Sequence, residues 1–288
     1  MSDLILFNAN VIAMDPAFPH AQLVAIQGGK IIVVSGNGRL MELKKKNTKV
    51  IDCKGKTIVP GFVDAHFHLF GFAESLITIN LGPQSGIHSI SDIQKKIREQ
   101  SQQLPPTTWI RGRGYNEFYL AEKRHPNRRD LDSVTTVHPI KLTHRSGRAY
   151  VLNSLGLKLV GISKETGDPL GGLIDRDVET GEPTGLLYGM GDFLGRAIPP
   201  LERGQMEMGI KLANRELCAL GITSIHDASP RNNLDRWKLI QRWKKDRLLK
   251  TRVRMMLGKE GFEEYRRHRF PAQVDENQVS VGGVDHRA

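Results

Sequence analysis

Cysteine, aromatic residues and long apolar runs are scarce in this 288-residue chain, and each scarcity excludes a class of protein. Its two cysteines, Cys53 and Cys218, cannot build a disulfide framework or a four-cysteine zinc module. No stretch of about 18 uncharged apolar residues occurs, which excludes a membrane-spanning helix, and the first ten residues do not resemble a signal peptide. We therefore expect a protein of a reducing compartment, the cytoplasm, with no membrane partner.

The overall composition is that of a globular protein. Hydrophobic residues make up 39% of the chain and charged residues 25%, which excludes a disordered chain, a collagen and a coiled coil. The length allows one large domain or two ordinary ones, and either can bury a sizeable core.

The net charge of +11 is concentrated near one end of the chain. Residues 231–270 hold 14 Lys and Arg against 5 Asp and Glu. A basic stretch is one signature of nucleic-acid binding. Here the apolar residues Leu234, Trp237, Ile240 and Trp243 recur about every three positions, which predicts an amphipathic helix whose charges face water. No zinc-finger or RNP-type motif accompanies it, so nucleic acid is not the expected partner.

The pattern along the chain divides it into two regions. Residues 1–57 are β-rich, and a Gly28–Gly29 turn between Leu23–Gln27 and Lys30–Val34 predicts a hairpin. Residues 58–288 begin with mixed signals. There we expect a helix at Ser89–Gln103, strands at Trp109–Arg113 and Pro139–Thr143, turns at Gly167–Gly172 and Thr180–Gly185, and a helix at Glu202–Leu220.

Strands and helices then alternate regularly. We expect strands at Ile222–His226, Arg252–Leu257 and Val279–Val284, and helices at Leu234–Leu249 and Gly261–His268. Such alternation is typical of a parallel sheet or barrel.

The segment Thr57–Leu69, TIVPGFVDAHFHL, carries the strongest functional signal. Side chains two apart on a strand share a face. One face is then Phe62, Asp64, His66 and His68, and the other is Val63, Ala65, Phe67 and Leu69, which can pack under helices. Two imidazoles on one face can chelate a metal ion. Asp64 can orient one of these metal ligands without binding the metal itself. A bare His-x-His is also common among ordinary histidines, but the Pro60–Gly61 turn and the βα alternation favour the metal site.

Several stretches together resemble a known family. VPGFVDAHFH (residues 59–68) resembles the first-strand signature of the amidohydrolase superfamily. The segments 127–157, 171–187 and 220–229 are similar to amidohydrolase family 3, the branch that includes N-substituted formamide deformylase. The resemblance extends over almost the whole chain, and its four motifs occur in the family's order.

This resemblance implies a (β/α)₈ TIM-type barrel with a small β-sandwich, and an insertion at about residues 71–215 that covers the site. It implies that His66 and His68 bind a divalent metal, most often zinc, at the carboxyl end of the first barrel strand. Metal-activated water would then attack the carbon–nitrogen bond of a small, non-peptide amide. The implied protein is a hydrolase.

Further candidate residues lie at two places. His226 and Asp227 end the second barrel strand and so reach the catalytic rim, or else make only a rim hydrogen bond. His144, Arg148 and Asn153 are candidate substrate contacts. Relatives carry His where this chain has Arg148, a permanent cation that would recruit an anionic substrate or mark drift after loss of function.

The expected barrel is incomplete. Roughly 87 residues remain outside the β-rich segment and the insertion, enough for about three βα units and a fourth strand on the usual scale. The family's later ligands, a lysine, two histidines and an aspartate, have no counterpart. We therefore expect a truncated and inactive hydrolase, whose open strand edges and uncovered apolar face promote self-association or pairing with a missing C-terminal half. The alternative is a non-catalytic remnant with a binding role only.

Overall fold

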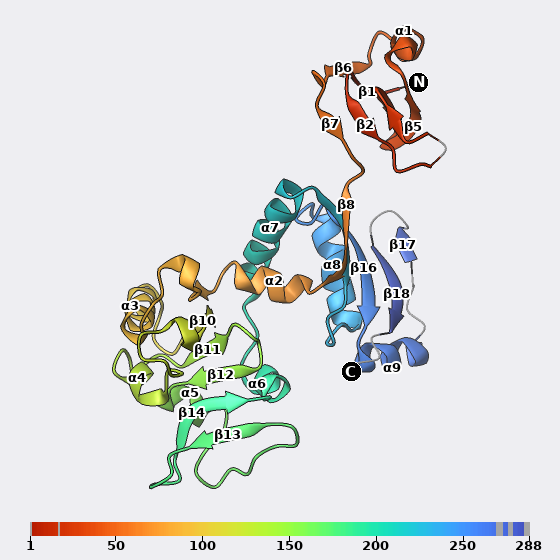
Figure 1. Cartoon of the computed structure of the whole chain (residues 1–288). Coiled ribbons are helices and arrows are strands. Elements are labelled where there is room, and N and C mark those ends of the chain that lie inside the picture. Colours follow the sequence, from red (N-terminus) through yellow and green to blue (C-terminus); the bar gives the residue numbers. More distant parts are fainter. Residues whose placement is uncertain (1, 17, 269–272, 276–278, 285–288) are drawn as a thin grey trace.

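The computed structural model describes residues 2–16, 18–268, 273–275 and 279–284, and it has a mixed α/β architecture (Figure 1). The chain has three parts, and the insertion interrupts the main body along the sequence. We refer to them as the N-terminal segment (residues 2–58), the insertion (residues 76–201) and the main body, which contains the remaining described residues.

The N-terminal segment consists of two small sheets with strand orders β5-β4-β1-β6 and β3-β2-β7. Its elements are β1 (Leu4–Phe7), β2 (Asn10–Ile12), β3 (His20–Ala21), β4 (Leu23–Gln27), β5 (Lys30–Ser35), a 3₁₀ turn (Asn37–Arg39), α1 (Leu40–Leu43), β6 (Lys49–Asp52) and β7 (Thr57–Ile58). The predicted hairpin is confirmed as β4 and β5. Gly28 and Gly29 both have positive φ, 55° and 76°, which only a residue without Cβ adopts readily.

The insertion is built on a six-stranded sheet of order β13-β14-β12-β11-β10-β9. Its elements are β9 (Ile79–Asn80), α3 (Ile90–Ser101), β10 (Ile110–Tyr115), α4 (Arg128–Asp132), β11 (Ile140–His144), β12 (Ala149–Leu152), α5 (Ser154–Leu159), β13 (Leu173–Arg176), β14 (Pro183–Tyr188) and α6 (Gly191–Ala197), with 3₁₀ turns at Pro83–Ser85 and Glu117–Tyr119. Ser89 caps α3 by accepting a hydrogen bond from the Asp92 N–H.

One turn expected in the insertion is instead partly a strand. Thr180–Gly185 was expected to turn, but β14 begins at Pro183 and continues through Gly185. A Cβ on Gly185 would collide with the Leu152 carbonyl oxygen on the neighbouring strand β12. Glycine is therefore favoured at position 185 for two reasons: β14 packs closely against β12 there, and the backbone has a positive φ of 97°.

The main body contains a five-stranded sheet of order β17-β18-β16-β15-β8. Its elements are β8 (Phe62–Phe67), α2 (Leu69–Ser75), α7 (Arg203–Ala219), β15 (Ile222–Asp227), α8 (Leu234–Lys245), β16 (Arg252–Leu257), α9 (Lys259–His268), β17 (Gln273–Asp275) and β18 (Val279–Val284). Strands β8, β15, β16 and β18 pair in parallel, as the βα alternation predicted. Over the described residues the sheet is open and forms no closed barrel.

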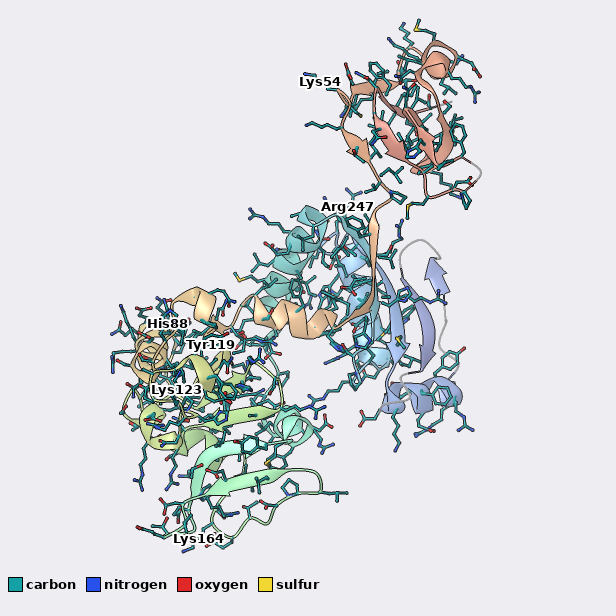
Figure 2. The ribbon with its side chains drawn as sticks, in the orientation of Figure 1. Lys54, His88, Tyr119, Lys123, Lys164 and Arg247 are labelled. Atoms are coloured by element: carbon teal, nitrogen blue, oxygen red, sulfur yellow. The ribbon has the colours of Figure 1, made fainter. Side chains whose placement is uncertain are left out.

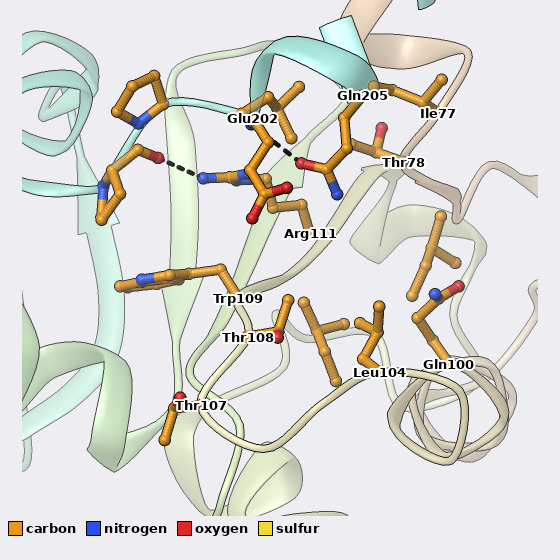
Figure 3. Close-up of a pocket in the computed structure, with 15 residues that line it drawn as sticks. Ile77, Thr78, Gln100, Leu104, Thr107, Thr108, Trp109, Arg111, Glu202 and Gln205 are labelled. Atoms are coloured by element: carbon orange, nitrogen blue, oxygen red, sulfur yellow. Dashed lines mark hydrogen bonds between the residues drawn. The ribbon is translucent and has the colours of Figure 1, made fainter. Parts of the chain in front are cut away.

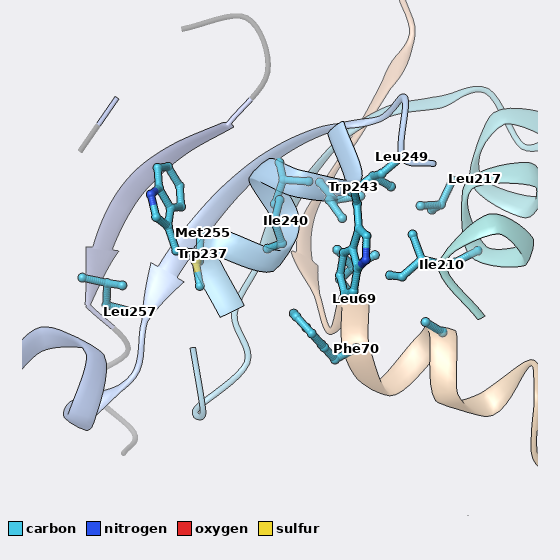
Figure 4. Close-up of a cluster of buried hydrophobic side chains, with 14 residues drawn as sticks. Leu69, Phe70, Ile210, Leu217, Trp237, Ile240, Trp243, Leu249, Met255 and Leu257 are labelled. Carbon is cyan, nitrogen blue, oxygen red and sulfur yellow. The ribbon is translucent and has the colours of Figure 1, made fainter. Parts of the chain in front are cut away.

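Helices α2, α7 and α8 cover one face of this sheet and enclose an apolar core with it (Figures 1 and 4). The predicted amphipathic helix is confirmed as α8, in which Trp237, Ile240 and Trp243 are buried. Leu69 and Ala73 of α2 and Ile210 of α7 lie in the same core. The insertion is therefore narrower than residues 71–215, because both flanking helices belong to the main body.

Charged side chains are distributed over the outside of all three parts. Figure 2 shows Lys54, Lys123, Lys164 and Arg247 projecting from the surface, where each is exposed. Within the described ranges, no helix combines the length and apolar character needed to cross a membrane.

Candidate active site

The two histidines of the strand signature lie together at the carboxyl end of β8. The centroids of the His66 and His68 rings are 5.1 Å apart, and the rings meet edge to face at 88°. Both side chains are exposed. His68 directly precedes α2, so the pair lies where the strand gives way to the helix. The structure therefore brings the two predicted metal ligands into contact with each other.

Strict alternation along β8 does not hold, which corrects the expected apolar face. The side chain of Val63 is 56% exposed, and Ala65 is exposed as well. Only Phe67 and Leu69 reach the core under the helices. The register of β8 against β15 shifts twice, and β8 is the last strand on its side of the sheet, so its side chains do not follow a regular two-residue period.

Asp64 contacts the backbone of the histidine pair. Its Oδ1 accepts a hydrogen bond from the His66 N–H at 3.0 Å. This hydrogen bond stabilises the backbone of β8 where its register against β15 shifts. It therefore positions His66 through the backbone of that residue. Its expected role, orienting an imidazole directly, stays a prediction.

A short hydrogen-bonded chain leads from Asp227 to His68. The Ser229 hydroxyl donates to Asp227 Oδ1 at 2.6 Å, and its oxygen lies 3.4 Å from His68 Nδ1. The Ser229 hydroxyl donates its only proton to Asp227, so its oxygen acts as the acceptor toward His68. His68 therefore carries its ring proton on Nδ1. The Nε2 lone pair of His68 is then available to a ligand.

Sequence reasoning missed Ser229, although the motif at residues 220–229 contains it. The signal was its position two residues beyond Asp227, at the end of β15. Asp227 is fully buried, and its Oδ1 also accepts from the Ser229 N–H at 3.0 Å. The rim hydrogen bond that we considered for Asp227 is thus present, and its partner is Ser229.

His226 and Asp227 lie on opposite faces of β15. Ile225 and Asp227 are buried toward the helices, whereas His226 is half-buried and pairs with Arg254 of β16, an exposed residue on the open face. Neighbouring residues on a strand point to opposite sides. The two residues therefore do not form a joint catalytic group at the rim.

His144 lies at the end of β11 in the insertion, against Glu117. Its Nε2 is 2.8 Å from Glu117 Oε2, and its Nδ1 accepts from the Ser146 N–H at 3.2 Å. Burial lowers the pKa of His144, although the Glu117 charge acts in the opposite direction. His125 lies on the other side of the same carboxylate, 3.7 Å from Glu117 Oε1. His144 is thus part of an internal cluster of the insertion.

Asn153 and Arg148 have different surroundings from those expected of substrate contacts. Asn153 is fully buried, and its amide caps α5 by accepting from the Gly156 N–H. The same amide accepts from the Ile140 N–H and donates to the His138 carbonyl. Asn153 is therefore a structural residue, which corrects its assignment to substrate binding. Arg148 is exposed on the hairpin between β11 and β12.

The histidine pair fits two positions of a metal site. Each imidazole is exposed, and the Ser229 contact leaves Nε2 of His68 available. A catalytic zinc ion normally takes three protein ligands and a water. In the described part of the chain, no group of three or more His, Cys, Asp or Glu is placed to hold a metal. The pair therefore supplies two of the three protein ligands that such a site requires.

Solved structures show the same fold as this chain. It superposes on an uncharacterized metal-dependent hydrolase from Pyrococcus furiosus with a TM-score of 0.72 and 21% identity, covering 98% of this chain and 55% of that one. A second such hydrolase, from Pyrococcus horikoshii, gives 0.72 and 19%, covering 98% and 53%.

Curated relatives match only part of their own length. N-substituted formamide deformylase from Arthrobacter pascens is 36% identical over 65% of this chain and 34% of its own. The putative amidohydrolase YtcJ from Bacillus subtilis is 33% identical over 67% and 37%, respectively. The matched region thus spans about a third of the length of these relatives.

A family model agrees with these pairwise similarities. The model described as the amidohydrolase family matches residues 49–287, which is most of the sequence and includes β8, β15 and the segments that hold His66, His68 and Ser229. The chain therefore belongs to the amidohydrolase family.

Proposed function

We propose that this chain forms part of a metal-dependent hydrolase that cleaves carbon–nitrogen bonds of small, non-peptide amides. Membership of the amidohydrolase family supports an enzyme by resemblance, and the name of the relative from Arthrobacter pascens indicates formamide-type substrates for that protein. The observation that carries the proposal is the His66–His68 pair at the end of β8, with Ser229 joining His68 to Asp227.

In this proposal the sheet of β8, β15, β16 and β18 is the first part of a (β/α)₈ barrel, with the histidines at the carboxyl end where such sites lie. A bound divalent ion, zinc in the first instance, would lower the pKa of water to about 7 and polarise the amide carbonyl. His66 and His68 would hold it through ring nitrogens. Asp64 would position the His66 backbone, and Ser229 would keep the proton of His68 on Nδ1.

The alternative is a chain with a binding role only. The observation that favours it is the number of ligands, because the described residues supply two where a catalytic zinc needs three. A third ligand would then have to come from outside the described residues. A cytoplasmic location also stays a prediction from the cysteine content.

The test is zinc binding and amide hydrolysis by the purified chain. We expect His66→Ala to lower zinc affinity, measured by competition with a chromogenic chelator, because it removes one of two imidazoles. His88→Ala is the matched control, since His88 is an exposed histidine of the insertion (Figure 2). Equal zinc affinity in both variants would show that the histidine pair is not the site. Zinc binding without hydrolysis of an N-substituted formamide would favour the binding role.

A further inference from the structure

A cavity of about 580 Å³ lies between the main body and the insertion, beside the histidine pair. His68 and Ser229 line it from the main body, and Lys141 and Tyr150 line it from the insertion. A molecule in this cavity therefore contacts the candidate site and the insertion together. The charged residues of its wall are Glu74, Arg111, Lys141, Asp192, Arg231 and Arg236.

Lys141 is the most unusual of these residues. It lies on β11, half-buried, with its Nζ 5.4 Å from the centroid of the Tyr150 ring. Among the described residues, no carboxylate oxygen lies within 4.0 Å of its Nζ. Burial lowers the pKa of Lys141, and the Arg111 and Arg231 charges lower it further, while Glu74 opposes them. A partly buried ammonium group with cationic neighbours is costly unless an anion joins it.

Two further cations hold fixed places around Lys141. Arg111 of β10 donates from Nη2 to the Pro199 carbonyl at 2.5 Å, which holds its guanidinium in place. Figure 3 shows this hydrogen bond from a second pocket, which Arg111 also lines. Arg231, in the loop before α8, donates to the Gly191 carbonyl and pairs with Asp192 at 3.0 Å. Because Asp192 is 86% exposed, that pair contributes little by itself.

Arg236 completes the positive wall from α8. Its guanidinium carbon lies 4.3 Å from the centroid of the Phe70 ring. Burial lowers the pKa of Arg236, and the charge of Asp227 opposes this shift. Four cations thus line the cavity against two carboxylates, Glu74 and Asp192. This excess of positive charge surrounds the space next to His68.

We propose that the cavity binds a carboxylate group of the substrate, so that the substrates are amides that also carry a carboxylate. This inference rests on the proposed function. The planar guanidinium groups and the ammonium group match the geometry and charge of a carboxylate. In this proposal Lys141 and its neighbours, rather than Arg148, recruit the anionic substrate, because Arg148 lies on an exposed hairpin.

The test is binding of succinamate, a small monoamide carrying one carboxylate, measured by titration calorimetry on the whole chain in metal-free buffer with EDTA. Succinamide is the neutral control, and inorganic phosphate tests whether another oxyanion is preferred. We expect Lys141→Gln and Arg231→Gln each to weaken succinamate binding about tenfold, since a charged hydrogen bond is lost. Lys95→Gln removes the same charge from the exposed surface of α3 and should leave binding unchanged. Circular dichroism checks that each variant is folded.

The outcomes separate this inference from the proposed function. Equal binding of succinamate and succinamide, or equal affinity in Lys141→Gln and Lys95→Gln, overturns the carboxylate site. Tighter binding of phosphate than of succinamate overturns the choice of carboxylate. Lysine-dependent succinamate binding in a chain that binds no zinc retains the carboxylate site and refutes the hydrolase. Hydrolysis of neutral formamides without succinamate binding does the reverse.

Discussion

Ser229 is the residue whose role is most directly testable, because a single oxygen joins a buried carboxylate to a candidate metal ligand. Removing the hydroxyl in Ser229→Ala leaves His68 free to rotate and to change tautomer. We expect zinc affinity to fall about tenfold, the lower end of what outer-shell contacts contribute. Chelator competition measures it, and Ser229→Thr, which keeps the hydroxyl, should restore most of the affinity. An unchanged affinity in Ser229→Ala would refute the positioning role.

The lowered pKa of His144 predicts that the stability of the chain depends on pH. Its pKa in the folded chain is below the ordinary 6.5, chiefly because of burial, so the unfolded chain binds the proton more tightly. Unfolding free energy should therefore be highest above pH 6.5 and fall as the pH drops through 6.5 toward the lowered value. Urea unfolding at pH 7.5 and 5.5 measures this loss.

The control for this titration is another histidine of the insertion. His144→Gln should flatten the pH dependence of the unfolding free energy, whereas His88→Gln should not, because His88 is exposed. Identical slopes in the two variants would show that the internal cluster with Glu117 does not govern acid stability.

At the scale of elements, α2 and α7 approach each other so closely that only glycine fits between them. A Cβ on Gly209 of α7 would lie 2.6 Å from the Ala73 carbonyl oxygen of α2. We expect Gly209→Ala to destabilise the chain by about 1–3 kcal/mol through overpacking, despite the higher helix propensity of alanine. Chemical denaturation measures the change.

The same helix provides the matched substitution. Gly204 lies in the first turn of α7, and a Cβ there meets nothing within 4 Å. Gly204→Ala should leave stability unchanged or raise it by up to about 1 kcal/mol. A loss of stability equal to that of Gly209→Ala would mean that the contact with α2 is not the cause.

The elements also show how far the sequence could be interpreted. Strong periodicity predicted β15, α8, β16 and β18 within two or three residues for most boundaries, because the apolar residues of α8 all face one core. Strands β12 and β14 were missed. They pair with each other and with the preceding strands β11 and β13, and strand formation depends so strongly on such packing that it leaves little local signal.

The candidate site was predictable to a similar extent. His66 and His68 followed from their spacing, and the structure brings their rings together. The irregular register of β8 was not visible in the sequence, because it depends on pairing with β15. That strand lies 160 residues further along the chain, beyond the insertion. The cavity charge was equally hidden, since Arg111, Lys141 and Arg231 come from three separate elements.

At the scale of the whole molecule, β8 presents an open strand edge within the described sheet. Phe62 and Val63 on this strand are 58% and 56% exposed. An exposed apolar edge strand favours pairing with another chain. We expect concentration-dependent self-association in sedimentation velocity experiments, reduced in Val63→Lys. A wild-type chain that stays monomeric at high concentration would contradict this expectation.

The cavity beside His68 also bears on how the molecule is held together. Its walls come from two parts that each have a core of their own, the insertion and the main body. A ligand that contacts both walls binds only while the two parts are docked, so its binding stabilises the docked arrangement. By mass action, a ligand at 100 times its dissociation constant would oppose their separation by about 2.7 kcal/mol. The concentration of such a ligand would then influence how firmly the two parts stay docked.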